Sequence, residues 1–227
     1  MTAVRIHVML SLAFKAAYLE LVPRFEQESG LEVATTFVGG AEIAKRLRAG
    51  EQTDLVIMAA KGIDDLIAEG LLAKGSRVDL VRSKIGVAVK AGAPRPDISS
   101  EAALRRALDA AKSIAYSSGP SGVYLAEVFK RWELAPAKLH QSAPGMPAGD
   151  FVASGECEIG FQQVSELLPV PGIDYVGPLP GELQLVTIFS AATSANARNA
   201  QASKALTRYF TSIGVVPVLA KHGLDPA

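Results

Sequence analysis

The sequence predicts an α/β fold of two lobes, each built around a mainly parallel sheet flanked by helices. Short unbroken apolar runs, such as residues 6–10 and 54–58, are typical of strands that are covered on both faces. Most of these runs are followed by a segment with apolar residues every three or four positions, the pattern of a helix that packs on one face. This alternation stops at residues 77–91 and starts again after the stiff segment 92–96, which predicts a second lobe.

The first strand, residues 6–10, is expected to run into a helix that begins near Ala13 and ends at Gly30. Ser11 lies between the two, at the carboxyl end of the strand. Ligands of open α/β sheets bind at such ends, where unpaired N–H groups and the positive end of the helix favour anions. Lys15, in the first turn, is poorly placed for the helix dipole and well placed for an anion. The alternative is a solvated lysine on an ordinary helix.

A second turn with exposed backbone is expected after the strand at residues 31–37. Gly39 and Gly40 precede a helix at about 42–49, and adjacent glycines let backbone N–H groups approach a ligand. A tight turn alone explains the pair equally well. The segment matches neither the dinucleotide fingerprint nor a P-loop.

The second strand and helix series is expected in the middle of the chain. Its helices cover about 100–111, 120–132 and 148–154, and its strands 113–117, 139–142 and 158–163. A strand at 183–190 returns the chain to the first lobe, which ends in helices at 197–211 and 215–221. Lobe I is thus expected to comprise residues 1–88 and 185–227, and lobe II residues 89–184. A cleft between two lobes is the default site for a small molecule.

Composition narrows the function classes. Lysine plus arginine equals aspartate plus glutamate, 23 each, so no overall charge attracts nucleic acid, and an anion site must be local. One cysteine and three scattered histidines predict neither a disulfide nor a metal site, and no motif predicts a cofactor. No apolar run approaches the roughly 20 residues of a membrane span. We expect a monomer that binds a small anion and no nucleic acid.

The first ten residues contain no basic segment, no long apolar segment and no small-residue cleavage site. As written, the chain is expected to be cytoplasmic. It is expected to be periplasmic if a leader was removed.

Four segments carry a family resemblance: the strand and helix at the start, VGGAEIAKRLRAGEQTDLVI, GPSGVYLAEVF and GECEIGFQQVSE. Together they resemble the type 2 periplasmic-binding-protein fold, and within it the molybdate-binding proteins of ABC transporters. The resemblance covers nearly the whole chain. It implies a substrate-binding protein with a two-lobed cleft, and an ABC transporter permease as partner if the protein is exported.

The residues that hold the oxyanion in that family are replaced in this sequence. By position, the two serines of the molybdate-binding proteins correspond to Ala13 and Gly40 of this sequence, and their tyrosine corresponds to Gln163. Two backbone N–H sites fall on Ser121 and near Gly145, each at a helix start. A site discriminates ligands by pairing each polar group, so the loss of three hydroxyls predicts a different ligand. A small carboxylate is therefore favoured over molybdate.

The expected ligand-binding set combines the strand ends with the positions of the resemblance: Ser11, Ala13, Lys15, Gly39, Gly40, Ser121, Gly145 and Gln163. Gln162 and Gln163 point to opposite sides of an extended strand, and Gln163 is favoured to face the ligand. The alternative is that both glutamines hydrogen-bond the hinge.

The segments QQVSELLPVPG and GPLPGELQ also resemble a branch of the family that includes bacterial aconitate isomerases. The resemblance implies an enzyme alternative, a 1,3-proton shift on a tricarboxylate, beside the favoured solute-binding role; an intracellular ligand sensor is a third alternative. Proton transfer needs a base, and the sequence offers four: Glu42, Glu166, His7 and Tyr124. No dyad is visible, so the catalytic residue stays open.

Nucleophilic catalysis is disfavoured. Residues 119–123 lack the last glycine of G-x-S-x-G, and Ser11 and Lys15 are one residue too far apart for S-x-x-K. Cys157 lies between two glutamates, which would raise the pKa of its thiol and make it a structural residue.

Overall fold

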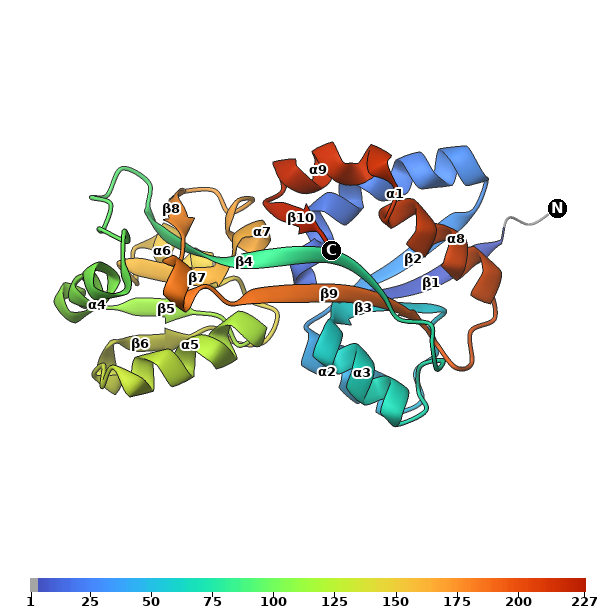
Figure 1. Ribbon diagram of the computed structural model, residues 1–227, viewed down its shortest axis with the longest axis horizontal. Coiled ribbons are helices and arrows are strands. Elements are labelled where there is room, and N and C mark those ends of the chain that lie inside the picture. Colours follow the sequence, from blue (N-terminus) through green and yellow to red (C-terminus); the bar gives the residue numbers. More distant parts are fainter. Residues whose placement is uncertain (1–3) are drawn as a thin grey trace. The chain divides into compact units, whose positions relative to one another are not determined.

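The computed structural model describes residues 4–227 and divides into two compact units (Figure 1). Unit 1 contains the chain up to Arg82 and Ile188–Ala227, and unit 2 contains Ser83–Thr187. The chain passes from one unit to the other in two strands, β4 (Val78–Lys90) and β9 (Val186–Thr193). The lobe boundaries expected from the sequence, after residues 88 and 184, fall within β4 and just before β9.

The sheet of unit 1 has the strand order β2-β1-β3-β9. Its strands β1 (Arg5–Leu10), β2 (Glu32–Phe37) and β3 (Leu55–Ala59) are parallel, and β9 is antiparallel to β3. The short β10 (Leu224–Pro226) pairs with β4. Because β1, β2 and β3 are parallel, their carboxyl ends share one edge of the sheet, here called the unit 1 edge.

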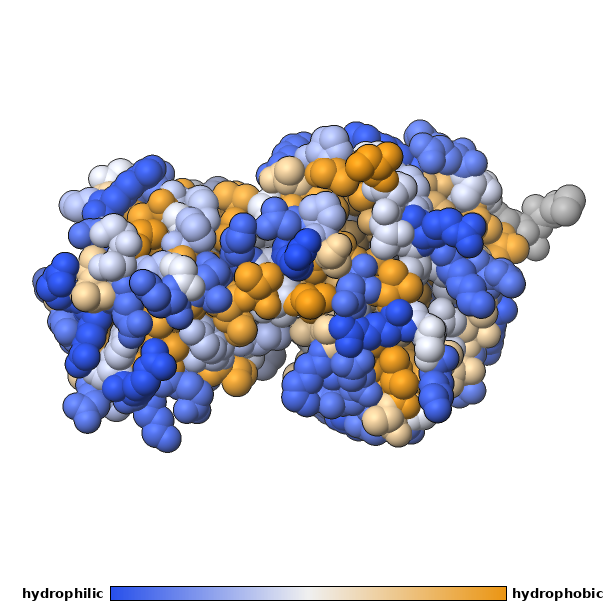
Figure 2. Space-filling view, in the orientation of Figure 1, coloured by the Kyte–Doolittle hydropathy of each residue, from blue (hydrophilic) through white to orange (hydrophobic). Residues whose placement is uncertain are grey.

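Helices cover both faces of this sheet. On one side lie α1 (Lys15–Ser29), α8 (Ala200–Phe210) and α9 (Val216–Lys221); on the other lie α2 (Gly40–Arg48) and α3 (Ala60–Ala68) (Figure 1). The outer faces of α2 and α3 are largely hydrophilic (Figure 2), as expected of helices that bury only one side. The apolar side expected of α1 is confirmed, because its residues Tyr18, Leu21 and Phe25 are all buried in the core.

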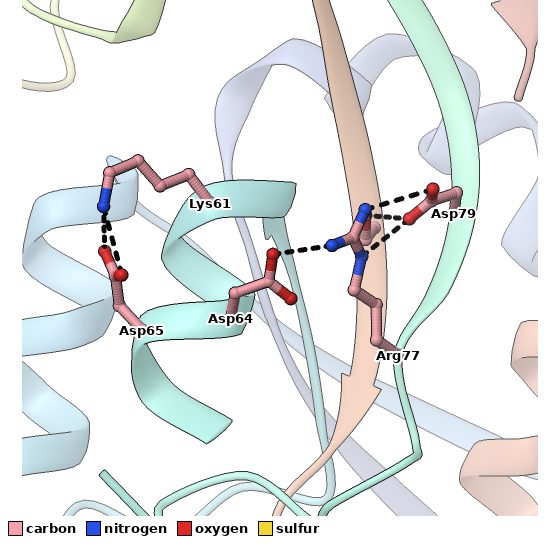
Figure 3. Close-up of polar contacts among 6 residues, drawn as sticks. Lys61, Asp64, Asp65, Arg77 and Asp79 are labelled. Atoms are coloured by element: carbon pink, nitrogen blue, oxygen red, sulfur yellow. Dashed lines mark hydrogen bonds and ion pairs between the residues drawn. The ribbon is translucent and has the colours of Figure 1, made fainter. Parts of the chain in front are cut away.

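An ionic cluster holds the start of β4 in unit 1 (Figure 3). The Arg77 guanidinium donates to Asp79 at 2.8 Å and to Asp64 of α3 at 2.6 Å. The Ser190 hydroxyl of β9 donates to Asp79 at 2.6 Å. Lys61 and Asp65 form a separate pair along α3. The cluster therefore joins α3, β4 and β9.

The sheet of unit 2 combines a parallel and an antiparallel part. The strands β5 (Ile114–Tyr116), β6 (Leu139–Gln141) and β7 (Ile159–Gln163) are parallel, with β5 in the middle. The second half of β4 pairs antiparallel with β7 and with β8 (Ile173–Pro178). The carboxyl ends of the parallel strands β5, β6 and β7 share one edge of this sheet, here called the unit 2 edge.

Four α-helices accompany this sheet: α4 (Glu101–Ala110), α5 (Pro120–Arg131), α6 (Ala148–Ser154) and α7 (Val164–Leu167). Phe129 of α5 packs against Phe161 of β7 and Tyr116 of β5. On the other face, α6 approaches closely because β7 has a glycine there: a Cβ at Gly160 would collide with Val152. Short 3₁₀ helices complete the chain at Leu12–Phe14, Pro136–Lys138, Gly181–Leu183 and Ile213–Val215.

The structure differs from the sequence-based expectation in several elements, among them the short strand β10 and the bounds of β9. Residues 77–91, where the alternation of strands and helices was expected to stop, contain a 13-residue strand, β4, whose first half mixes buried and exposed residues. The strand β8 was not expected, because IDYVGP contains residues that strands disfavour. The first helix begins as a 3₁₀ turn, so α1 proper starts at Lys15.

Candidate functional site

The predicted ligand-binding residues lie at the two strand edges, five in unit 1 and three in unit 2. The unit 1 edge has Ser11, Ala13, Lys15, Gly39 and Gly40. The unit 2 edge has Ser121, Gly145 and Gln163.

Ser11 directly follows β1 and presents an unpaired hydroxyl. Its backbone N–H donates to the Ile57 carbonyl of β3 at 2.9 Å, which fixes the residue at the edge. Its side-chain oxygen is buried and has no hydrogen-bond partner. A buried hydroxyl without a partner is costly, so this group is ready to bond a ligand. The adjacent Ala13 is buried in the 3₁₀ turn and supplies no hydroxyl.

Lys15 is the first residue of α1 and its side chain is exposed. A cation at the amino end of a helix is opposed by the helix dipole. The ammonium group lies 5.2 Å from the centre of the Phe37 ring, at the end of β2. This cation–π contact holds the charge over the unit 1 edge.

Gly39 and Gly40 begin α2. Neither glycine has a positive φ, so the backbone conformation of the turn does not require them. A Cβ at Gly40 would lie 3.2 Å from the Met58 methyl group, which leaves little room for a side chain. At Gly39 a Cβ would meet nothing within 4 Å. The pair thus leaves the start of α2 bare for close approach.

Ser121 lies in the first turn of α5 at the unit 2 edge. Its hydroxyl is 3.0 Å from the hydroxyl of Ser117, which follows β5, and both residues are buried. The next residue must be glycine, because a Cβ at Gly122 would collide with the Ser117 carbonyl. Gly145, in the loop before α6, has φ +84°, a conformation that favours glycine.

Gln163 ends β7 and is almost fully buried. Its amide nitrogen donates to the Thr187 hydroxyl at 2.9 Å, and its amide oxygen has no partner. The Thr187 hydroxyl both donates and accepts, so the amide can turn over and keep this bond. Gln163 can therefore offer a ligand either an acceptor or an NH₂ donor.

The side chain of Gln162 contacts the start of α6, whereas that of Gln163 contacts Thr187. Its amide oxygen accepts from the Ala148 N–H at 2.7 Å, at the start of α6. Glu166 follows Gln162 by four residues and lies in α7. Burial raises the pKa of Glu166 to about 7, and the bond from Gln162 opposes part of that rise.

The other three candidate bases, Glu42, Tyr124 and His7, are less suited to accept a proton from a ligand at a strand edge. Glu42 accepts from Arg46 at 2.9 Å, and this bond lowers its pKa. Tyr124 donates its hydroxyl proton to the Leu183 carbonyl at 2.9 Å. His7 lies in β1, two residues after its amino end, where it lines a pocket of about 180 Å³ together with Asp54 and Arg198. That pocket lies away from the unit 1 edge.

Sequence reasoning missed three polar residues at the unit 2 edge. Ser117 supports Ser121, and Thr187 holds Gln163. Ser142 follows β6, and its buried hydroxyl has no partner. A serine directly after a strand, as at Ser11, is the signal that could have identified Ser117 and Ser142.

Among residues 4–227, which the structure describes, no helix has the length and apolar character to cross a membrane. The same residues contain no group of three or more acidic, histidine or cysteine side chains that could hold a metal ion. The buried thiol of Cys157 has a raised pKa, caused first by burial and then by Glu156.

This chain is similar in sequence to a protein described as an enzyme, and in structure to several binding proteins. A protein described as aconitate isomerase, from a Pseudomonas species, is 39% identical over 215 residues, which cover 91% of this chain and 82% of that protein. The periplasmic molybdate-binding protein of Azotobacter vinelandii has a TM-score of 0.80 at 16% identity, with 96% of this chain and 98% of that chain covered.

The sulfate-binding protein SubI of Mycobacterium tuberculosis has a TM-score of 0.78 at 17% identity, with 99% and 87% of the two chains covered. These structural similarities confirm the predicted binding-protein fold. The model of the family described as bacterial extracellular solute-binding protein matches residues 6–225. This chain therefore belongs to the bacterial extracellular solute-binding protein family.

Proposed function

We propose that this protein binds a small tricarboxylate and interconverts the cis and trans forms of aconitate by a 1,3-proton shift. The observation that carries the proposal is the 39% identity to an aconitate isomerase over 91% of the chain. The structures of binding proteins for inorganic oxyanions are similar to this chain at much lower identity, 16% and 17% in the two cases above.

The polar groups at the unit 1 edge support a carboxylate ligand. Lys15 supplies a positive charge, and charge-assisted hydrogen bonds are roughly twice as strong as neutral ones. The unpaired hydroxyl of Ser11 and the bare backbone at Gly39 add donors beside it. Ala13 and Gly40 lack the hydroxyls that a compact oxyanion would need in this family.

The unit 2 edge supports the same class of ligand. Gln163 has an unpartnered amide end that can become an NH₂ donor. Ser121 lies in the first turn of the 12-residue helix α5, whose amino end favours negative charge. The polar groups of this edge therefore support a carboxylate ligand independently of those of the unit 1 edge.

A 1,3-proton shift requires two contributions from the protein, a base and groups that stabilise a carbanion. One group removes a proton from a carbon next to a carboxylate, and cationic and N–H groups stabilise the resulting delocalised carbanion. Lys15 and the helix starts are the proposed stabilising groups.

The test is to incubate the purified protein separately with cis-aconitate and with trans-aconitate and to follow both compounds by chromatography. An isomerase brings the two samples to the same mixture from either side. Heat-inactivated protein is the control. If neither compound changes at high protein concentration, the proposed activity is refuted.

Transport-associated binding is the second candidate, because the family match covers nearly the whole chain. It predicts that the protein holds a ligand unchanged. Calorimetry with aconitate, citrate, molybdate, tungstate and sulfate distinguishes the cases. Submicromolar affinity for molybdate without conversion of aconitate would favour this second candidate.

A further inference from the structure

We propose that unit 1 has a second binding site, separate from the unit 1 edge, that holds the phosphate group of inorganic phosphate or of a small phosphate ester. The site is the pocket of about 180 Å³, here called the His7 pocket. It is lined by His7, Gln52, Thr53, Asp54, Asn196 and Arg198. The inference goes beyond the proposed function and does not depend on it.

The His7 pocket lies at the amino ends of β1 and β3. His7 is the third residue of β1, and residues 53–54 directly precede β3. Because β9 is antiparallel to β3, the residues after its carboxyl end, including Asn196 and Arg198, return to the same place. Four residues of extended chain separate His7 from Ser11, a distance of about 13 Å. A ligand in the pocket is therefore remote from the unit 1 edge.

The segment 194–199, which forms one wall of the pocket, is fixed to its surroundings at both ends. The Ser194 N–H donates to the Asp54 carbonyl at 3.0 Å. The Asn199 side chain donates to the Arg5 carbonyl at 2.9 Å. Groups that are held in place before a ligand arrives lose less entropy when it binds, so this wall is suited to recognition.

Asp54 is the acidic residue of the pocket, and the protein itself meets its charge. Asp54 is 3% exposed, and its two carboxylate oxygens accept from the backbone N–H groups of His7 and Asn199, each at 2.9 Å. Asn199 directly precedes α8, so the carboxylate also lies at the positive end of that helix. Asp54 therefore opposes an anion in the pocket only weakly.

Arg198 supplies a positive charge that no carboxylate compensates. Its guanidinium donates to the Gln52 amide oxygen at 3.0 Å, which is a neutral partner. No ion pair within residues 4–227 includes Arg198. The side chain is exposed, and its planar fork of N–H groups matches two oxygens of a phosphate.

Two more side chains add donors around the same hollow. The His7 ring carries at least one N–H in either tautomer, and the Asn196 side chain carries an NH₂ group. Both residues are exposed, and neither side chain makes a hydrogen bond within the described part of the chain. Gln52 accepts from Arg198 through its oxygen, so its NH₂ end is also available.

The volume and the donors together select a phosphate group. A water molecule occupies about 30 Å³ in the liquid, so the pocket has room for about six waters. One phosphorus with its oxygens fits this room, whereas a tricarboxylate is too large to enter whole. A carboxylate offers only two oxygens, but a phosphate can offer one to each of several donors that surround it.

The test follows the histidine rings by NMR while inorganic phosphate is added. The protein has three histidines, of which only His7 lines the pocket; His140 lies on β6 and His222 follows α9. We expect the His7 ring signals, assigned with His7→Gln, to shift and reach saturation while those of the other two histidines stay in place. Sodium chloride at the same ionic strength is the control for screening.

Variants at the pocket wall show whether the donors act as proposed. Arg198→Gln removes charge-assisted hydrogen bonds and should weaken phosphate binding by about ten- to hundredfold. Arg208→Gln removes the same charge from an exposed position of α8 outside the pocket and should bind phosphate like the wild type. Arg198→Lys keeps the charge but not the fork and should have an intermediate affinity. Asn196→Ala should also weaken binding, which tests the site even if Arg198→Gln folds poorly.

The outcomes are decisive in both directions. A His7 shift that never saturates, an equal shift with sodium chloride, or wild-type phosphate affinity in Arg198→Gln would overturn the site. Tighter binding of acetate than of phosphate would overturn the choice of ligand. A parallel titration with glycerol 3-phosphate distinguishes a free phosphate from an ester by which of the two binds more tightly. Conversion of aconitate enters none of these outcomes, so the site and the proposed function are tested separately.

Discussion

Replacement of Lys15 by methionine tests how this protein recognises charge. Methionine keeps an unbranched stem over Phe37 and removes the ammonium group, which lies 5.2 Å from the ring centre. The lost cation–π contact costs at most about 1 kcal/mol of stability at this exposed position. Removal of a cation from the amino end of α1 offsets part of that cost. We therefore expect the melting temperature to change little.

Affinity should respond more strongly than stability. A charge-assisted hydrogen bond to a carboxylate contributes about 1.5 to 3 kcal/mol, which corresponds to about a ten- to hundredfold loss of affinity. Calorimetric titration with trans-aconitate measures the effect. Lys45→Met, on the exposed side of α2, removes the same charge from the same unit and is the matched control.

The difference in aconitate affinity between Lys15→Met and Lys45→Met should also depend on salt in a defined way. If Lys15 acts by contact, the difference between the two variants should persist at 0.5 M salt, where charges more than a few ångströms apart are screened. Equal affinities of Lys15→Met and the wild-type protein would refute the reasoning and make Lys15 an ordinary surface residue. Equal losses in both lysine variants would show that only net charge matters.

Three further predictions concern single positions. Ser11→Ala removes a buried hydroxyl that has no partner, so the free energy of unfolding should stay the same or rise, while calorimetry should show weaker binding of aconitate. Gly122→Ala should destabilise the protein by at least about 2 kcal/mol in urea unfolding, because its Cβ meets the Ser117 carbonyl, whereas Gly39→Ala should change stability by less than about 1 kcal/mol. The hydrogen bond from Arg77 lowers the pKa of Asp79 in the folded protein. The pair therefore stabilises the fold fully above the pKa of aspartate in the unfolded chain, about 4. This contribution is lost as the pH falls through the lower pKa of Asp79 in the folded protein. Asp79→Asn should therefore reduce stability at pH 7 by about 1 kcal/mol, a modest amount because solvent screens the pair, and the difference from wild type should shrink in acid unfolding curves.

Most of the fold was predictable because its signals are local. The buried strand β1 and the amphipathic helix α1 each carry an unbroken pattern, and Gly30 ends α1 in the left-handed conformation that the sequence suggests. The first half of β4 was missed because charged residues interrupt it, and partners distant in sequence, such as Ser190, stabilise them. No local pattern shows that kind of support.

The candidate site also has features that a local sequence pattern predicts and features that depend on contacts between distant segments. Ser11 and Gln163 were predicted from their places at strand ends, and both have buried polar atoms without partners; their binding role stays a prediction. The raised pKa of Glu166 was not predictable, because it results from burial by segments far apart in the chain. The support of Gln163 by Thr187 likewise depends on a contact across 24 positions.

The order of the strands has a consequence for synthesis on the ribosome. The strand β3 pairs with β1 on one side and with β9 on the other, and β9 follows only after the whole of unit 2. Until β9 emerges, the nascent chain carries β3 with an unpaired edge of apolar residues, Leu55–Ala59. Unit 2 is continuous in sequence and can complete its sheet first. An exposed apolar edge invites pairing with other chains, so the interval between the two strands is when this protein is most prone to aggregate.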